Sequence, residues 1–250
     1  MTFEETMREL ERLGTEQNRK TYGRHGAPQP LFGVSFADLG KLTRRIKRDQ
    51  ALAEALWATG NTDARTLATM IADPAAFTPA KLDAWLGELR YHGLIDALVK
   101  DLAAPSSDAR AMMDRWTASE DEWIGRAGWT LLGQLAADEA SALPDAVFEE
   151  RLAAIEAGIH GAKNRARQAM NLALISIGGR NERLRTLAVA AAKRLGPIEV
   201  DHGDTSCKTF EAIPYIEKMW ARKEKRPAAA KPAPAAKAAS VAAKGKSKKV

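Results

Sequence analysis

Three segments that resemble one another decide the fold of this 250-residue chain: residues 65–73 read RTLATMIAD, residues 126–133 read RAGWTLLG, and residues 167–174 read RQAMNLAL. Each begins with an arginine and continues with apolar side chains at helical spacing. Their first residues lie 61 and 41 positions apart, and pairs of helices of this length recur about every 40 residues. A period near 40 is typical of HEAT-like repeats, whose helix pairs stack into a curved solenoid.

The segments around these three show the same apolar period. Residues 18–30 read NRKTYGRHGAPQP, and their glycines and prolines predict an irregular basic loop. No stretch alternates between apolar and polar residues as strands do, so we predict an all-α fold, a HEAT-like repeat α-solenoid (an α-α superhelix). The expected helices span residues 3–13, 35–47, 49–59, 64–72, 79–91, 93–103, 107–116, 119–137, 145–159, 162–178, 181–195 and 212–221.

Composition divides the chain into a folded body, residues 1–220, and a C-terminal tail, residues 221–250. The tail consists mostly of Ala, Lys and Pro, with ten Lys or Arg against one Glu. Such a segment cannot bury enough apolar surface to fold alone, so we predict a disordered basic tail. It would add salt-dependent affinity for nucleic acid. The alternative is a solubilising tail without a fixed partner.

The net charge of +6 is unevenly distributed. Residues 19–48 and residues 160–195 each contain eight basic residues and one acidic residue, whereas residues 50–159 contain eight basic and eighteen acidic residues. If the two basic segments meet on one face, they form a surface suited to a phosphate backbone. The alternative is that both are solvated helix faces without a partner.

Composition also excludes several classes of protein. No apolar run reaches the roughly 18 residues that a membrane span requires, and the acidic N-terminus is unlike a signal peptide. The single cysteine, Cys207, excludes an intramolecular disulfide framework. There is no P-loop, dinucleotide-binding fingerprint or GxSxG motif. We therefore expect a soluble, cytoplasmic monomer with no cofactor and no membrane partner.

Three groups of residues invite a chemical interpretation. Residues 201–207 combine Asp, His and Cys, but a second Cys/His pair is missing, so we expect no metal and favour a polar turn held by Asx and Thr hydrogen bonds. Cys207 with His202 as its base is weakly supported, because nothing nearby except Lys208 favours a thiolate. Tryptophans at helical spacing are more typical of a core than of a ligand site; they are Trp57, Trp85, Trp116, Trp123 and Trp129.

A fourth candidate is a carboxylate inside an apolar helix. Residues 89–99 read LRYHGLIDALV, in which Asp96 lies among leucine, isoleucine and valine side chains at helical spacing. A carboxylate in such surroundings needs a partner or has a function.

Around Asp96, the order and spacing of several motifs resemble the AlkD-type DNA alkylation repair proteins, which are HEAT-like repeat alkylpurine DNA glycosylases. The resemblance runs from about Thr21 to Leu195. It rests on Tyr22 with Phe32-Gly33-Val34, Leu56-Trp57 followed by Arg65-Thr66-Leu67-Ala68, Ile95-Asp96, Trp116 with Trp123-Ile124-Gly125-Arg126-Ala127, and residues 167–174.

The resemblance implies a DNA repair protein that binds double-stranded DNA, alkylated or distorted, on its concave face. It also implies excision of alkylated purines by hydrolysis of the N-glycosidic bond. Active members use an aspartate near that bond, a nearby arginine, and two tryptophans against the DNA backbone. Asp96 matches the aspartate and Arg126 the arginine, so these are the catalytic candidates. Because a cationic alkylpurine is a good leaving group, the carboxylate has mainly to stabilise positive charge on the sugar and position water.

Two positions depart from the family's pattern. His92, beside Tyr91, stands where the family has its first tryptophan, and Leu172 or a neighbour where it has the second. Tyr91 or His92 could stack instead of the first, whereas Leu172 cannot replace the second. Three alternatives therefore stay open: a structural Asp96 bonded to Arg126 or a helix N-terminus, a non-catalytic binder of distorted or branched DNA, and a protein-interaction scaffold. The candidate DNA contacts are Tyr91, His92, Arg44, Arg45, Lys47, Arg48, Lys163, Arg165 and Arg167.

Overall fold

The computed structural model describes residues 1–225, in which every regular element is a helix. The α-helices are α1 (Phe3–Leu13), α2 (Glu16–Arg24), α3 (Phe36–Ile46), α4 (Gln50–Ala58), α5 (Thr62–Ile71), α6 (Pro79–Gly87), α7 (His92–Leu98), α8 (Ala109–Thr117), α9 (Glu122–Ala137), α10 (Asp145–Gly158), α11 (Asn164–Gly178), α12 (Glu182–Leu195) and α13 (Ala212–Lys225). Three short elements join them: η1 (Pro74–Ala76), the π-helix η2 (Val99–Ala103) and η3 (Ile159–Gly161).

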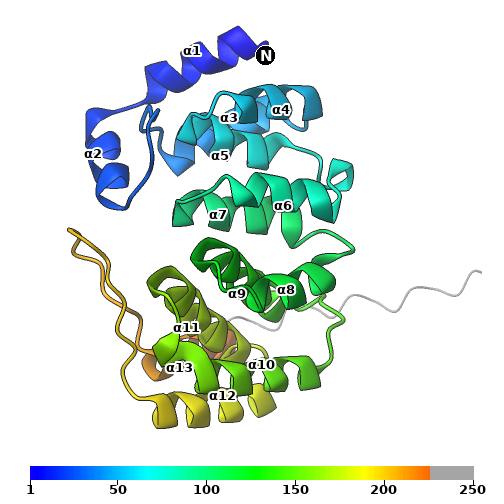
Figure 1. The fold of residues 1–250 in the computed structure, drawn as a ribbon, viewed down its shortest axis with the longest axis vertical. Helices are drawn as coiled ribbons and strands as arrows, with labels where there is room; N and C mark the ends of the chain where they lie inside the picture. The colour runs from blue at the N-terminus through cyan, green and yellow to red at the C-terminus, as the bar shows by residue number, and fades with distance from the viewer. Residues whose placement is uncertain (226–250) are drawn as a thin grey trace, which may run out of the picture.

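The helices are stacked in layers, one above another along the long axis (Figure 1). Helices α5, α7, α9 and α11 each contact the next, and we call these four the inner row. Helices α4, α8 and α10 pack beside α5, α9 and α11. The three repeated sequence segments fall in α5, α9 and α11. The sequence repeat therefore marks three of the four helices of the inner row, and the predicted all-α solenoid is confirmed.

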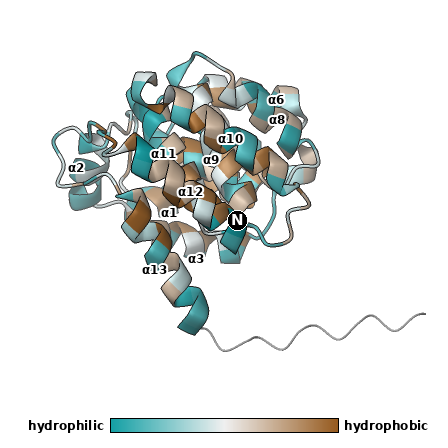
Figure 2. Cartoon of the chain, turned by 90° about the horizontal axis from the view of Figure 1, so that it is seen from below, coloured by the Kyte–Doolittle hydropathy of each residue, from teal (hydrophilic) through white to brown (hydrophobic). Residues whose placement is uncertain are grey.

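A single apolar core runs through the stack, from Leu10 in α1 to Ile216 in α13. Hydrophobic residues gather where helices meet and hydrophilic ones face outward (Figure 2). The rings of Trp57 and Trp85 stack within this core with centroids 3.8 Å apart, which confirms the core interpretation for these tryptophans. At Gly128 a Cβ atom would collide with the backbone of Thr117, so the absence of a side chain lets α9 approach α8 closely.

Helix α2 occupies the segment for which the sequence predicts an irregular loop, so that prediction was wrong. The side chain of Thr15 caps the helix by accepting a hydrogen bond from the backbone N–H of Asn18 at 3.2 Å. The prolines Pro28 and Pro30 lie beyond its end at Arg24, where they cannot interrupt its hydrogen bonds. The helix expected over residues 79–91 is also shorter, because α6 ends at Gly87.

A buried carboxylate on α5 holds the loop that follows α2. Asp63 accepts hydrogen bonds from the backbone N–H groups of Phe32, Gly33 and Val34 at 2.7, 2.9 and 2.9 Å. Gly33 has a φ of +81°, and a Cβ atom there would lie 2.7 Å from the backbone nitrogen of Arg19. Glycine thus lets the three N–H groups converge on one carboxylate.

Helix α13 continues to Lys225, beyond residue 221, where the sequence predicts its end. Ile216 is fully buried and packs against Gly178 of α11. From residue 226 onward the predicted disordered tail lies outside the described residues. None of the helices in residues 1–225 has the length and apolar character needed to cross a membrane.

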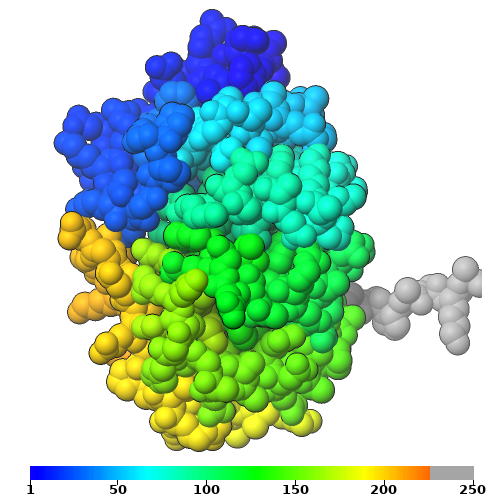
Figure 3. Space-filling model, in the orientation of Figure 1, coloured from blue at the N-terminus to red at the C-terminus, as the bar shows by residue number. Residues whose placement is uncertain are grey.

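Residues 197–211, which we call the strap, connect α12 to α13. The strap, yellow to orange, runs along one edge of the stack toward α2 (Figures 1 and 3). A Cβ atom on Gly203 of the strap would lie 3.8 Å from the carbonyl oxygen of Arg24, at the end of α2. The strap therefore brings chain from the C-terminal end of the solenoid close to its N-terminal part.

Candidate functional site

Asp96 of α7 forms a bidentate ion pair with Arg126 of α9. Nη2 of Arg126 lies 2.7 Å from Oδ2 of Asp96, and Nε lies 3.1 Å from Oδ1. The hydroxyl of Thr130 donates to Oδ1 at 3.3 Å. The Arg126 side chain is 2% exposed, whereas that of Asp96 is 40% exposed. The structure thus brings the two catalytic candidates together, with the arginine as a buried anchor and the carboxylate facing outward.

Helix α11 holds Arg126 from the other side. Nη1 of Arg126 donates to Oε1 of Gln168 at 3.0 Å and to the carbonyl oxygen of Arg165 at 3.3 Å. The sequence interpretation missed both Thr130 and Gln168. Thr130 lies one helical turn after Arg126, a spacing that could have indicated it. The part played by Gln168 depends on how α11 packs on α9, and the sequence carries no signal for it.

The carboxylate of Asp96 borders a pocket of about 340 Å³. Leu172, at the family's second tryptophan position, lies in its wall. Two aromatic residues, Phe210 from the strap and Tyr215 from α13, also line the pocket and were missed, because they lie outside the stretch that carries the resemblance. The other lining residues are Trp129, Thr130, Gly133, Gln134, Ala137, Ala173, Ile175, Ser176 and Met219.

Of the two rings that could stack on DNA at the family's first tryptophan position, Tyr91 is buried and His92 is half-buried, so stacking stays a prediction for His92 alone. Tyr91 is 8% exposed, and burial raises its pKa to about 12. The His92 ring is in edge-to-face contact with the rings of Tyr91 and His25, at centroid distances of 5.0 and 6.0 Å. Burial, reinforced by the charge of Arg126, lowers the pKa of His92 to about 3. His92 is therefore neutral at physiological pH.

The N-terminal ends of the inner-row helices lie along one edge of the stack, which we call the shared edge. Arg126, near the start of α9, bonds to Gln168 and to the backbone of Arg165, near the start of α11. The backbone N–H of Arg165 donates to Oε1 of Glu122, the first residue of α9, at 2.6 Å. Tyr91 precedes α7, and its pKa is raised mainly by burial and also by the nearby charge of Asp63, at the start of α5. The starts of α5 and α7 therefore lie near each other.

Basic residues from the first segment divide between two places, so the two basic segments meet on one face only in part. Helix α2 reaches the shared edge through Arg24, beside the strap. The last turn of α3 and the two residues after it, with the predicted contacts Arg44, Arg45, Lys47 and Arg48, lie elsewhere. Arg48 donates to the carbonyl of Ala72, at the opposite, C-terminal end of α5. Arg45 lies 3.6 Å from Glu9 of α1.

The shared edge carries its own cations. Lys163 is exposed and donates to the carbonyl of Glu120 at 2.9 Å. Hydrogen bonds from backbone N–H groups at the start of α9, with the charges of Arg90 and Lys163, lower the pKa of Asp121. Arg90, which the sequence interpretation missed, and Lys163 therefore both lie near Asp121, at the start of α9. The predicted contact Arg167 instead donates to the carbonyl of Glu199 at 3.1 Å and so holds the strap.

Polar side chains of α11 fasten the strap. The Asn164 side-chain amide exchanges two hydrogen bonds of 2.8 Å with the backbone of Asp201. Within the strap, Oδ1 of Asp201 accepts from the N–H of Gly203 at 2.7 Å, and the Thr205 hydroxyl donates to the carbonyl of His202 at 3.0 Å. The polar-turn interpretation is confirmed. Among residues 1–225, no group of three or more His, Cys, Asp or Glu is placed to hold a metal ion.

Comparison with known proteins identifies relatives along most of the chain. The family model described as DNA alkylation repair enzyme matches residues 6–216, and so extends past both limits of the sequence resemblance to include the strap. An uncharacterized protein of Listeria innocua is 30% identical over 225 residues, which cover 87% of this chain and 97% of that protein. An uncharacterized protein of Listeria monocytogenes is 29% identical with the same coverage.

One solved structure is also similar. It is described as a new family of proteins related to the HEAT-like repeat DNA glycosylases with affinity for branched DNA structures. It superimposes with a TM-score of 0.82 and 32% sequence identity, over 89% of this chain and 95% of that chain.

Proposed function

The chain belongs to the DNA alkylation repair enzyme family, and from this we propose that it binds DNA, preferring branched or distorted forms, at the edge where α7, α9 and α11 begin. The observation that carries the proposal is the group of cations along that edge. Arg90 and Lys163 are exposed there, near Asp121, and Arg165, near the start of α11, is half-buried. Exposed cations beside helix N-termini suit phosphate groups, since both attract negative charge.

Two further observations support a preference for branched or distorted DNA. The solved relative, 32% identical over 89% of the chain, is described as having affinity for branched DNA structures. The tryptophan pair that packs against the duplex backbone in active family members is missing, because the first position holds His92, a half-buried imidazole in contact with two other rings, and Leu172 has no ring. These features favour recognition of DNA shape over excision.

The test compares a labelled four-way DNA junction with a linear duplex of the same sequence, by fluorescence anisotropy at several salt concentrations. We expect tighter binding to the junction. Replacing Arg90 and Lys163 together with alanine should weaken binding about tenfold and reduce the salt dependence, because phosphate contacts are lost. The matched control replaces Arg44 and Arg45, two cations distant from the shared edge, and should change affinity less than threefold.

Three results would count against this proposal. Equal losses from the two double variants would assign binding to net charge rather than to the shared edge. Binding that disappears when the chain is shortened after Lys225 would assign it to the basic tail. No DNA binding at all would favour the protein-interaction scaffold. If the shortened chain keeps its preference for the junction, the folded body is the DNA-binding domain and the boundary with the tail lies after Lys225.

Excision of alkylpurines is a second candidate, favoured by one observation: Asp96 is oriented by a buried arginine and borders a pocket. For 7-methylguanine, the bond between C1′ and N9 would break with its electron pair leaving on the base. Water would add to C1′ and release its proton to solvent. Asp96 would stabilise the developing positive charge on the sugar and position that water.

Release of 7-methylguanine from alkylated DNA tests this second candidate. The wild type should release it, and Asp96→Asn should not. The control Asp38→Asn, which removes a carboxylate from α3, should behave like the wild type. If the wild type releases no base while still binding the junction, the excision candidate falls and the DNA-binding proposal stands.

A further inference from the structure

The pocket beside Asp96 has an aromatic wall formed by chain outside the inner row. Phe210 and Tyr215 both line it, and their ring centroids lie 4.3 Å apart with the planes tilted by 31°. We propose that Phe210 is the surface on which an unpaired nucleobase of the bound DNA stacks, with Tyr215 supporting it. This inference rests on the proposed DNA binding and names the part of the DNA that the pocket accepts.

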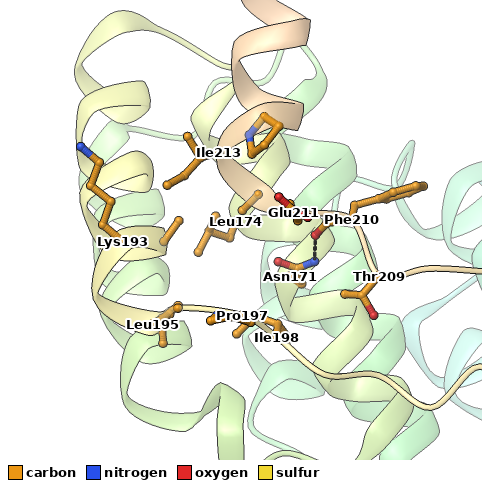
Figure 4. A pocket seen from close by; sticks show the side chains of 14 residues that line it. Asn171, Leu174, Lys193, Leu195, Pro197, Ile198, Thr209, Phe210, Glu211 and Ile213 are labelled. Carbon is orange, nitrogen blue, oxygen red and sulfur yellow. Dashed lines mark hydrogen bonds between the residues drawn. The ribbon is translucent and has the colours of Figure 1, made fainter.

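A hydrogen bond from α11 fixes the position of Phe210. Asn171 is 3% exposed, and its Nδ2 donates to the carbonyl oxygen of Phe210 at 2.8 Å. Figure 4 shows this bond, with the Phe210 ring pointing away from Leu174 and Ile213. Phe210 also lines the neighbouring pocket of about 490 Å³ that those two residues line, so it stands between the two pockets. Breaking the bond would leave a buried amide without a partner, so the strap is held at the residue that carries the ring.

Tyr215 supports Phe210 on a rigid base. The next residue, Ile216, is fully buried against Gly178, which ties the start of α13 to α11. The ammonium group of Lys218 lies 5.7 Å from the centre of the Tyr215 ring. Tyr215 therefore already has Phe210 and a cation as neighbours, whereas Phe210 keeps 45% of its surface exposed. A large apolar ring left this exposed at a pocket is suited to a ligand.

The remaining lining fits a nucleobase, which has apolar faces and a polar edge. Leu172 and Trp129 supply apolar surface. The Ser176 hydroxyl can donate to a ring nitrogen or carbonyl, whereas the Thr130 hydroxyl, which already donates to Asp96, can accept from an N–H of the base. The outward face of Asp96 can accept a hydrogen bond from an exocyclic amine. The pocket volume of about 340 Å³ lies within the range of small-molecule sites.

The base must be unpaired, because a base inside a duplex is stacked on both faces and cannot reach a pocket wall. Branch points and distorted sites expose such bases at low energetic cost. The cations of the shared edge would hold phosphates at the end of the pocket where Asp96 lies, since Arg126 links Asp96 directly to the start of α11. One arrangement then accounts for both the preference for branched DNA and the exposed Phe210 ring.

The experiment uses the full chain and 2-aminopurine, a fluorescent base whose emission falls when it stacks. One probe carries it unpaired at a branch point, and the other carries it paired within a linear duplex. With the wild type, emission of the unpaired probe should fall on binding. Phe210→Ala should abolish this quenching and weaken binding of the unpaired probe about tenfold, with duplex affinity unchanged within twofold.

Two further variants distinguish aromatic stacking from misfolding and from a simple need for apolar volume at this position. Phe210→Trp keeps an aromatic face and should retain the quenching, whereas Phe210→Leu keeps apolar volume and should lose it. The matched control is Phe36→Ala on α3, which removes a phenylalanine that is 55% exposed elsewhere, and it should behave like the wild type.

The outcomes separate this inference from the proposed function. If the wild type binds both probes and Phe210→Ala or Phe210→Leu binds and quenches as the wild type does, the stacking surface is overturned while DNA binding stands. If the wild type binds neither probe, the proposed function fails and the inference fails with it. Quenching that survives in Phe210→Trp alone would establish the aromatic face as the cause.

Discussion

Two aspartates of the inner row, Asp63 in α5 and Asp96 in α7, show how similar positions in the stack take on different tasks. Asp63 is 3% exposed, and its two oxygens accept three backbone N–H groups from one loop. The side chain of Asp96 is 40% exposed and is held by side chains of α9. A carboxylate saturated by backbone donors holds the chain together, whereas one anchored on a single side keeps a face for a ligand. Partner type and exposure therefore distinguish the two.

The largest expected effect comes from removing the Asp63 carboxylate. Asp63→Ala leaves three backbone N–H groups without their acceptor, two of them buried, and should lower the free energy of unfolding by about 3–5 kcal/mol. Urea denaturation measures this loss. The control is Asp49→Ala, which removes a helix cap that accepts one N–H, from Leu52, and should cost about 1 kcal/mol. Equal losses in the two variants would contradict the conclusion that Asp63 holds the loop after α2.

Replacing the other aspartate, Asp96, should lower the free energy of unfolding by less. Asp96→Asn removes the charge that pairs with Arg126, but the amide oxygen can still accept one hydrogen bond, and Gln168 remains an acceptor for Nη1. We expect a loss of about 1–3 kcal/mol, measured by the same denaturation. Adding Arg126→Met to this variant should cost less than the same change in the wild type, because the two residues interact. A loss greater than that of Asp63→Ala would reverse the comparison.

The surroundings of Asp96 should also make stability depend on pH through His92. Its pKa is about 3 in the folded chain, because of burial and the charges of Arg126, Arg165, His25 and His202, against about 6.5 when unfolded. Between these values the unfolded chain binds the extra proton, so stability falls as the pH is lowered from 6.5 toward 3.

The measurement compares the wild type with His92→Gln between about pH 6.5 and 4.5. Gln has no proton to gain, so the variant should have a shallower pH dependence, with a difference of no more than about 1.4 kcal/mol per pH unit. Other titrating groups contribute to both proteins and cancel in the comparison. If the two curves of stability against pH are parallel, His92 gains its proton in the folded chain as readily as in the unfolded chain, despite the charge of Arg126.

The smallest effect is expected at an exposed ion pair. Arg45 lies 3.6 Å from Glu9, and its side chain is 60% exposed, against 2% for Arg126. Arg45→Ala should change the free energy of unfolding by less than about 0.5 kcal/mol, because water and salt screen the pair. Denaturation at low and high salt tests this. A loss as large as that of Arg126→Met would show that burial does not separate the two pairs.

The family's short motifs predicted residues but not always their tasks. The resemblance identified Phe32-Gly33-Val34, and the structure shows that their N–H groups surround Asp63. It also paired Asp96 with Arg126, which the structure brings together at 2.7 Å. It could not indicate Phe210 or Tyr215, because an aromatic residue in a segment without a repeat carries no signal of what it will face.

Some predictions failed for reasons of packing. The glycines and prolines of residues 18–30 suggested a loop, yet the prolines follow α2 and leave its hydrogen bonds intact. The basic residues around Arg44 were predicted to contact DNA together with those of α11, but α3 directs them to the other end of α5. Tyr91 was expected to be accessible and is buried.

The sequence by itself determined all the α-helices but α2, and it determined the repeat that marks the inner row, because periodicity and capping depend on residues a few positions apart. Tertiary structure alone decided that the carboxylate of Asp63 is buried and that of Asp96 is partly exposed. It also decided which cations share an edge with Asp96 and which aromatic ring borders its pocket. Those properties arise from contacts between helices distant in the chain, whose exposure and partners are set only when the layers pack.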